Sequence, residues 1–152
     1  ICQVYAGMFD IDLTVVRLAN IVGGKSNKGV TYDFVNKLEE DPEELEILGD
    51  GRQRKSYLHV EDTVKGIIAA WNSEETVFNV GNTDSIDVTR IAEIVSEEMG
   101  LEPKFSYTGG RKGWKGDVPE MRLSIDRLEG EGWSPELDSE QSIRKTVREL
   151  RE

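Results

Sequence analysis

The chain has 152 residues, enough for one domain with a hydrophobic core, and 37% of them are apolar. Its 30 acidic residues outnumber its 19 basic ones, and the net charge of -11 argues against nucleic acid as a partner, because phosphate binding needs a broad basic face. No apolar run approaches the roughly 20 residues of a membrane span, and a single cysteine, Cys2, excludes an internal disulfide. The composition predicts a soluble, acidic protein of the reducing cytoplasm.

The first elements predict part of a helix and one buried strand. Residues 1–9 carry apolar side chains at helical spacing, namely Ile1, Val4, Tyr5 and Met8. Residues 13–18, LTVVRL, are apolar on both faces, which is typical of a buried strand in a parallel sheet. Such a strand needs neighbours on both sides, and the chain offers few others of this type. A start at Ile1, inside a helix, is what a piece of a longer protein would show.

A basic turn follows the next helix and strand. Residues 29–39 form an amphipathic helix and residues 45–48 a short strand. Residues 49–62, GDGRQRKSYLHVED, lead from a tight turn through a cationic cluster into a strand over residues 57–60. The cluster consists of Arg52, Arg54 and Lys55. Guanidinium and ammonium groups held this way suit an anion of high charge density, such as a diphosphate. The alternative is a solvated turn whose charges offset acidic neighbours.

The second half alternates helices and strands. We expect Asp62 to cap a helix, followed by a strand at residues 76–80 and a helix between Asp87 and Gly100. Trp133 is expected in the core after a short helix, and Asp138 with Gln141 predicts a capping box for a terminal helix. The inner face expected after Asp62 is Val64, Ile67, Ile68 and Trp71.

A glycine-rich loop over residues 109–119, GGRKGWKGDVP, is the second stretch that suggests chemistry. It carries Arg111, Trp114, Lys115 and Asp117. The basic pair suits phosphates, the aromatic plane suits a base or sugar, and the carboxylate suits ribose hydroxyls. The alternative is a surface loop with one buried tryptophan. We expect the positive side chains of this loop and of the basic turn to converge on one pocket.

Several motifs, taken in their order and spacing, resemble the extended short-chain dehydrogenase/reductase superfamily. They are RLANIVGG at residues 17–24, KSYLHVED at 55–62, FNVG at 78–81, WKGD at 114–117 and EGW at 131–133. This superfamily contains the NAD-dependent nucleotide-sugar epimerases and dehydratases, such as UDP-glucose 4-epimerase. The resemblance implies an α/β fold, in which residues 1–24 end an NAD-binding Rossmann domain. Residues 25–152 would be mostly the smaller substrate-binding domain, with some segments able to return to the Rossmann part.

The resemblance also assigns roles to residues. Leu18 and Ala19 would line the nicotinamide side of NAD, and Asn20 would reach the substrate phosphates; for Asn20, a turn residue bonded to its own backbone is the alternative. Either Arg54 or Lys55 would grip the diphosphate, and the choice stays open. The family arginine of the glycine-rich loop is missing at its expected place. Its role would fall to Arg111 or Lys115, with Trp114 and Asp117 beside the nucleotide.

Two family motifs do not occur in the sequence. The Gly-x-x-Gly-x-x-Gly turn that seats the NAD pyrophosphate is absent, and so is the Tyr-x-x-x-Lys pair of acid–base catalysis. We therefore expect a nucleotide-binding half before Ile1, no catalytic residue within this chain, and no activity of the chain alone. Relatives imply a homodimer for the full-length protein. His59 is expected to pack or hydrogen-bond locally, and the spacing of the sequence predicts no metal site.

The function that this resemblance implies is that of an epimerase acting on a UDP-sugar. Bound NAD would oxidise a sugar hydroxyl and return the hydride to the opposite face. A 4,6-dehydratase or a reductase is an alternative within the superfamily, because the discriminating residues lie upstream. A binding or oligomerisation module without catalysis is the alternative from another class.

Overall fold

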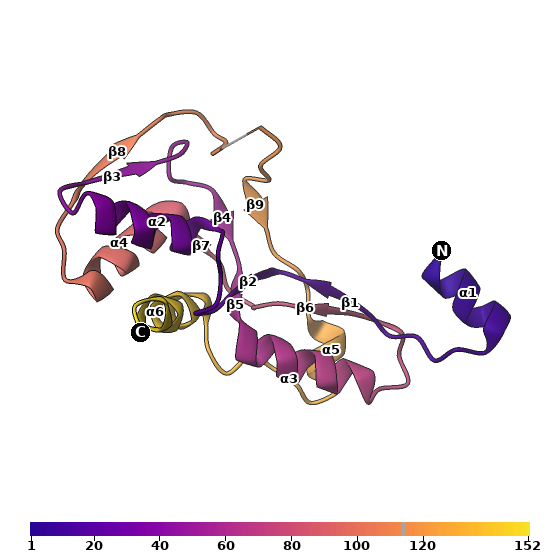
Figure 1. Ribbon diagram of the computed structural model, residues 1–152. Helices are drawn as coiled ribbons and strands as arrows, with labels where there is room; N and C mark the ends of the chain where they lie inside the picture. The colour runs from indigo at the N-terminus through magenta and orange to yellow at the C-terminus, as the bar shows by residue number, and fades with distance from the viewer. Residues whose placement is uncertain (114) are drawn as a thin grey trace.

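Two lobes of helices and strands, joined by short parallel strands, make up the computed structural model in Figure 1, which confirms the predicted α/β class. The structure describes residues 1–113 and 115–152. The helices are α1 (Cys2–Phe9), α2 (Val30–Glu40), α3 (Val60–Trp71), α4 (Val88–Met99), α5 (Asp126–Gly130) and α6 (Ser139–Leu150). The strands are β1 (Val15–Leu18), β2 (Asn20–Val22), β3 (Glu44–Ile47), β4 (Arg54–Lys55), β5 (Tyr57–His59), β6 (Val77–Val80), β7 (Ile86–Asp87), β8 (Lys104–Tyr107) and β9 (Glu120–Met121).

Most strand pairs are parallel and join segments that are far apart in the chain. β1 pairs with β6, β2 with β5, and β3 with β8, while β4 lies between antiparallel β7 and parallel β9. The sequence predicted β1, β3, β5 and β6 within one or two residues. It missed β2, β4, β7, β8 and β9, because strands of two to four residues carry too little alternation to be recognised before their partners are known.

The larger lobe consists of α2, β3, α4, β8 and α6, which enclose the larger apolar core. α2 confirms the amphipathic helix predicted over residues 29–39, and Phe34 and Leu38, four residues apart on it, are both buried. α4 begins at the predicted cap Asp87, whose carboxylate accepts from the N–H of Arg90, and it ends at Gly100 with φ 70°. The left-handed conformation at that end explains the glycine.

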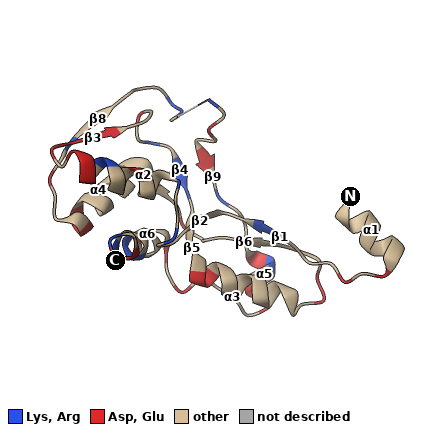
Figure 2. Ribbon diagram, viewed as in Figure 1, with Lys and Arg blue, Asp and Glu red and all other residues tan. Residues whose placement is uncertain are grey.

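A charged network joins α4 to α6 across the surface of the larger lobe. Figure 2 shows acidic and basic segments on these two helices. Arg90 donates to Glu140 at 2.7 Å, and Arg144 reaches both Glu140 and Glu98. α6 also begins with the predicted capping box of Asp138 and Gln141. The N-termini of α4 and α6 are therefore capped by side chains, and ion pairs between the two helices stabilise the outer surface of this lobe.

The smaller lobe consists of β1, α3, β6 and α5, around a core that includes Phe78 and Trp133. The predicted inner face of α3 is wrong. Val64, Ile68 and Trp71 are exposed, and the face that packs carries small residues such as Gly66 and Ala70. A Cβ on Gly66 would lie 2.8 Å from a methyl of Val80 and 3.0 Å from the Trp133 ring, so only glycine permits this close approach.

The prediction that Asp62 caps α3 is also wrong. The helix begins at Val60, three residues earlier than a cap at Asp62 implies, and His59 Nδ1 accepts the capping hydrogen bond from the N–H of Glu61 at 3.3 Å. The buried Asp62 carboxylate instead accepts from the N–H groups of Glu136 and Leu137, both at 3.1 Å. It thereby ties α3 to the segment that leads into α6.

β1 is less covered than predicted, and α1 has no buried residue. β1 is parallel to β6, as expected, but it is only half-buried at Val15 and Val16 and exposed at Arg17 and Leu18. The reason is that β6 is its one strand partner among the described residues. α1 confirms the predicted first helix, but it extends away from the rest of the chain in Figure 1 and none of its residues is buried. Within the described residues, no helix combines the length and the hydropathy that crossing a membrane requires.

Candidate functional site

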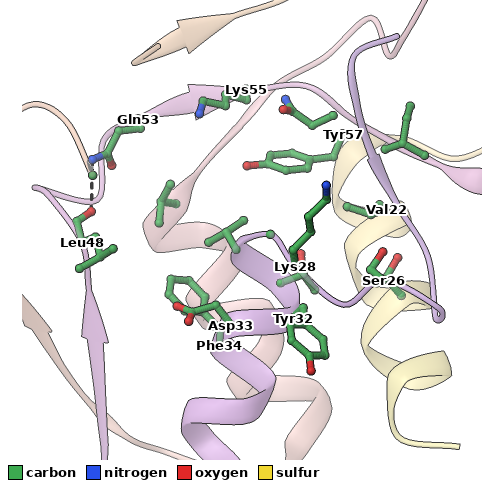
Figure 3. Close-up of a pocket in the computed structure, with 18 of the residues that line it drawn as sticks. Val22, Ser26, Lys28, Tyr32, Asp33, Phe34, Leu48, Gln53, Lys55 and Tyr57 are labelled. Carbon is green, nitrogen blue, oxygen red and sulfur yellow. Dashed lines mark hydrogen bonds between the residues drawn. The ribbon is translucent and has the colours of Figure 1, made fainter. Parts of the chain in front are cut away.

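A pocket of about 550 Å³ opens beside the N-terminus of α2. Its walls come from the end of β2, the first turn of α2, the segment through β4 and β5, and the glycine-rich loop. In Figure 3, Gln53 and Leu48 lie at one end, Val22 and Ser26 at the other, and the two lysines Lys28 and Lys55 lie between them. The pocket therefore has a charged middle and two less charged ends.

Alternate residues of one extended segment form a wall of this pocket. Gln53, Lys55 and Tyr57 line it, whereas Arg54 and Ser56 do not. Side chains of an extended chain point alternately to opposite sides, which explains this pattern. The Arg54 guanidinium lies on the other side and donates to Oγ and the carbonyl of Ser85, at 2.9 and 2.8 Å. Of the two candidates for the basic residue, the fold thus brings Lys55 to the pocket.

Lys55 is ion-paired with Asp117 across the pocket wall, with Nζ 2.6 Å from Oδ1. Asp117 is buried, and its Oδ2 accepts from the N–H of Gly113 at 3.2 Å. Burial raises the pKa of the Asp117 carboxyl, but the hydrogen bonds from Lys55 and from two backbone N–H groups outweigh it, so the net pKa is lower than usual. The carboxylate is therefore charged at neutral pH and holds the glycine-rich loop against β4.

Tyr57 contributes a buried phenol to the same wall. Burial raises its pKa above the usual 10.0, and the negative charge of Asp117 raises it further. The hydroxyl therefore stays protonated at physiological pH. It can donate a hydrogen bond to a ligand or to water, and it adds no negative charge to the pocket.

The first turn of α2 faces the pocket without a side-chain cap. Its N-cap is Gly29, whose φ of 99° favours glycine and which has no side chain to accept from the turn above. Lys28 and Thr31 also line the pocket, and the buried Thr31 Oγ1 has no hydrogen-bond partner among the described residues. Backbone N–H groups at a helix N-terminus attract anions, and Lys28 adds a full positive charge.

Sequence reasoning missed Lys28 and the start of α2 as parts of a site. The signal was the segment KSNKG at residues 25–29, which is basic and polar and lies directly before an amphipathic helix. A helix whose cap position is glycine, preceded by lysine, leaves its N-terminal amides for a ligand.

The other predicted residues are divided between the pocket and the surface. Asn20 lines the pocket, and its Nδ2 donates to the carbonyl of Ser56 at 3.0 Å, so it bonds across to another segment and not to its own turn. Arg111 and Lys115 are exposed and lie outside the pocket wall. The basic turn and the glycine-rich loop share one pocket, through Lys55, Gly113 and Asp117. The predicted convergence of positive side chains from both segments is wrong, because Arg111 and Lys115 do not line the pocket. Trp114 lies outside the described residues.

Leu18 and Ala19 lie at the carboxyl end of β1, outside the pocket wall. The Leu18 side chain is exposed, and the N–H of Ala19 donates to the carbonyl of Val80 at 2.9 Å. Asn20 follows directly and belongs to the pocket. The end of β1 and the pocket are therefore adjacent along the chain, one apolar and one polar.

His59, Glu61 and Glu149 form a cluster that sequence spacing did not reveal, with ligand atoms within 4.8 Å of one another. The Lys145 ammonium already lies 2.6 Å from Glu61. His59 Nδ1 accepts from the N–H of Glu61, so Nε2 carries the proton and donates to Glu149 Oε2 at 3.1 Å. In this tautomer His59 links β5 to α6 by a hydrogen bond, and Lys145 is paired with Glu61. This agrees with the local hydrogen-bonding role expected for His59.

Comparison with known proteins identifies the family of this chain. A profile of the NAD dependent epimerase/dehydratase family matches residues 1–81, which is 81 of the 152 residues. Among curated proteins, a UDP-glucuronate 4-epimerase from Thermodesulfobacterium geofontis is 26% identical over 149 residues, covering 94% of this chain and 44% of its own length.

Solved structures agree with this match. A crystal structure of UDP-galactose 4-epimerase superposes with a TM-score of 0.87 and 39% identity, covering 99% of this chain and 49% of that one. The UDP-glucose 4-epimerase of Thermotoga maritima, crystallised with UDP-glucose, gives 0.84 and 27%, with 99% and 49% covered. The chain spans about half the length of the relatives that it matches. On the profile match and this similarity of fold, the chain belongs to the NAD dependent epimerase/dehydratase family.

Proposed function

We propose that this chain forms the nucleotide-sugar-binding part of an enzyme like UDP-glucose 4-epimerase, with a UDP-linked hexose as substrate. The observation that carries the proposal is the pocket beside α2, where Lys28, Lys55 and an uncapped helix N-terminus line one space. A diphosphate is the part of such a substrate that needs these groups, because it carries concentrated negative charge and only accepts hydrogen bonds. The UDP-glucose bound by the Thermotoga maritima relative supports this assignment.

Within this proposal, Lys55 binds the Asp117 carboxylate and a substrate phosphate at the same time. Its ammonium has three N–H donors, of which one is used by Asp117 at 2.6 Å. The remaining two donors can bind a phosphate without loss of the ion pair that holds the glycine-rich loop. Asp117 Oδ1 and Oδ2 also suit ribose hydroxyls, and the Asn20 side chain suits a phosphate at the β2 end of the pocket.

The family implies NAD, and the residues of this chain fit one part of it. Leu18 and Ala19 present an apolar surface at the carboxyl end of β1, suited to the face of a flat nicotinamide ring. A Cβ on Gly81 would lie 3.0 Å from that of Ala19, so the backbone here is closely packed. NAD supplies the hydride acceptor of the reaction. The sequence holds no glycine-rich turn for its pyrophosphate, so we propose that residues outside these 152 bind most of it.

The proposed contribution of this chain to rate is positioning. No Tyr-x-x-x-Lys pair occurs in the sequence, so the acid–base step would also use residues outside it. Binding energy from the nucleotide diphosphate orients the hexose against the reacting groups, and this lowers the barrier although the phosphates do not react. A 4,6-dehydratase or reductase would use the same grip, and product analysis of the longer protein distinguishes them.

Calorimetric titration of the chain with UDP and UDP-glucose tests the grip. We expect Lys28→Gln and Lys55→Gln each to weaken UDP binding about tenfold or more, because a charge-assisted hydrogen bond contributes roughly 1.5–3 kcal/mol. Arg54→Gln is the matched control, since Arg54 is adjacent in the chain but faces Ser85, and it should leave binding unchanged. Lys28→Gln leaves the Lys55–Asp117 ion pair intact, so it separates binding from loop stability.

Two results would contradict the proposal. One is a folded chain, checked by circular dichroism, that shows no binding of UDP at millimolar concentration. The other is UDP affinity that neither lysine substitution changes. We also expect the 152-residue chain with added NAD to leave UDP-galactose unconverted in a coupled assay for UDP-glucose, and turnover would show that the acid–base groups lie within it.

A further inference from the structure

The end of the pocket at Gln53 has a buried acceptor that none of the described residues satisfies. Gln53 is 3% exposed and lines the pocket, and its Oε1 has no hydrogen-bond partner among the described residues. A buried acceptor without a partner is costly, so a group that supplies a donor there gains more than one that does not.

The orientation of this amide is determined by its neighbour. Gln53 Nε2 donates to the carbonyl of Leu48 at 3.2 Å, the contact drawn in Figure 3. Turning the amide over would bring two carbonyl oxygens together, so Oε1 remains the free atom. The site therefore requires an N–H or O–H donor, which no phosphate oxygen of a charged diphosphate offers.

The position of Gln53 selects among the parts of a nucleotide sugar. Gln53 precedes Lys55 by two residues on the same side of an extended segment, which separates them by about 7 Å. The wall on the far side of Gln53 from the lysines includes Leu48, and Phe34 and Val88 also line the pocket. An apolar wall next to a buried acceptor without a partner, beyond the diphosphate grip, suits a flat base with one N–H between carbonyl groups.

We propose that Gln53 reads the base of the nucleotide, with its Oε1 accepting a hydrogen bond from the imide N3–H of uracil. This assignment rests on the proposed function, because it takes the diphosphate to lie at Lys28 and Lys55. It makes Gln53 a specificity residue for pyrimidines with a protonated N3, and it adds no chemical step.

Titration of the 152-residue chain with UDP and 3-methyl-UDP tests the assignment without any substitution. Methylation of N3 replaces the N–H donor with a methyl group that would lie against Oε1, so we expect affinity to fall about tenfold or more. Equal affinity for the two nucleotides would overturn the proposal. If neither nucleotide nor UDP-glucose binds to the folded chain, the proposed function itself fails, which is a distinct result.

Substitution then tests whether Gln53 is the residue that contacts the base. Gln53→Met keeps the length of the side chain without its polar atoms, and we expect it to bind UDP and 3-methyl-UDP with similar affinity. Gln3→Met, the same change on exposed α1, should keep the full preference for UDP. A Gln53→Met chain that retains the preference would overturn the proposal. So would a Gln53→Met chain that instead loses only its discrimination between UDP and 2′-deoxy-UDP, because Gln53 would then read the ribose.

Discussion

The two lobes differ in how completely each buries its apolar side chains and pairs its charged ones. In the larger lobe, the apolar faces of α2, α4 and α6 meet one another and β3, and arginines and glutamates bridge the outside. In the smaller lobe, α3 packs through glycine and alanine and leaves Val64, Ile68 and Trp71 exposed, and β1 has an open edge among the described residues. An apolar stripe at helical spacing therefore predicts a helix in both lobes but a buried face in only one.

Residue size at the contact decides which side of each helix is buried. α3 approaches β6 closely because Gly66 has no Cβ, and this proximity places the large residues on the other side. The inner face of α4 carries branched residues such as Ile91, Ile94 and Val95, and its charged residues are not buried. Packing distance, set by residue size at the contact, thus outweighs hydrophobicity alone.

The largest expected effect compares one isoleucine from each lobe. Ile91 on α4 is fully buried and Ile68 on α3 is 55% exposed. We expect Ile91→Ala to lower the free energy of unfolding by about 2–5 kcal/mol, because it removes transfer energy and leaves a cavity. Ile68→Ala should change it by less than about 0.5 kcal/mol. Urea unfolding followed by circular dichroism measures both, and equal losses would show that the stripe on α3 is packed.

A second test concerns the close contact in the smaller lobe. In an unobstructed helix, alanine is favoured over glycine by about 1 kcal/mol, and Gly7→Ala in α1, with nothing within 4 Å, should follow that rule. Gly66→Ala should instead destabilise by about 1–3 kcal/mol, because its Cβ would overlap Val80 and Trp133. Thermal and urea unfolding report both changes. A Gly66→Ala chain more stable than the parent would rule out the tight packing of α3.

A third test uses acid to probe the charged network of the larger lobe. Hydrogen bonds from Arg90 and then Arg144 lower the pKa of Glu140 from 4.5 to about 2. Because the folded-state pKa is lowered, the stabilisation is complete above pH 4.5 and is lost as the pH falls toward about 2. Solvent screens this half-buried group, so we expect about 1 kcal/mol or less.

Measurement of unfolding free energy between pH 6 and pH 2 checks this expectation. Glu140→Gln should flatten the curve below pH 4.5, whereas Glu129→Gln in the smaller lobe, which has no ion-pair partner among the described residues, should leave its shape unchanged. Parallel curves for the parent and Glu140→Gln would mean that the network contributes nothing measurable.

The smallest expected effect on stability is at Trp71, which is 75% exposed at the end of α3. Trp71→Gln should change the unfolding free energy by less than about 0.5 kcal/mol, but it should reduce binding of an apolar fluorescent dye because it shrinks the exposed stripe. Unchanged dye fluorescence would locate the apolar surface elsewhere, with α1 as the next region to test.

Much of the candidate site could be predicted from the sequence. The motif KSYLHVED, the glycine-rich loop and RLANIVGG all contribute residues to one pocket, namely Lys55, Asp117 and Asn20. The choice between Arg54 and Lys55 also lay in the sequence, as the alternation of Gln53, Lys55 and Tyr57 along one extended segment. Lys28 could not be assigned in this way, because its role depends on the point in space at which α2 begins.

Local order followed from the residues themselves, because caps, turns and helical stripes depend on neighbours within a few positions. Asp87, Gly100 and the Asp138–Gln141 capping box act through such short-range contacts, and the sequence predicted each one. Only the tertiary structure decided which face of α3 is covered, that Asp62 holds residues 136 and 137, and that the cation opposite Lys55 is Lys28. Those outcomes depend on how closely distant segments approach, which residue volume and strand pairing set across the whole chain.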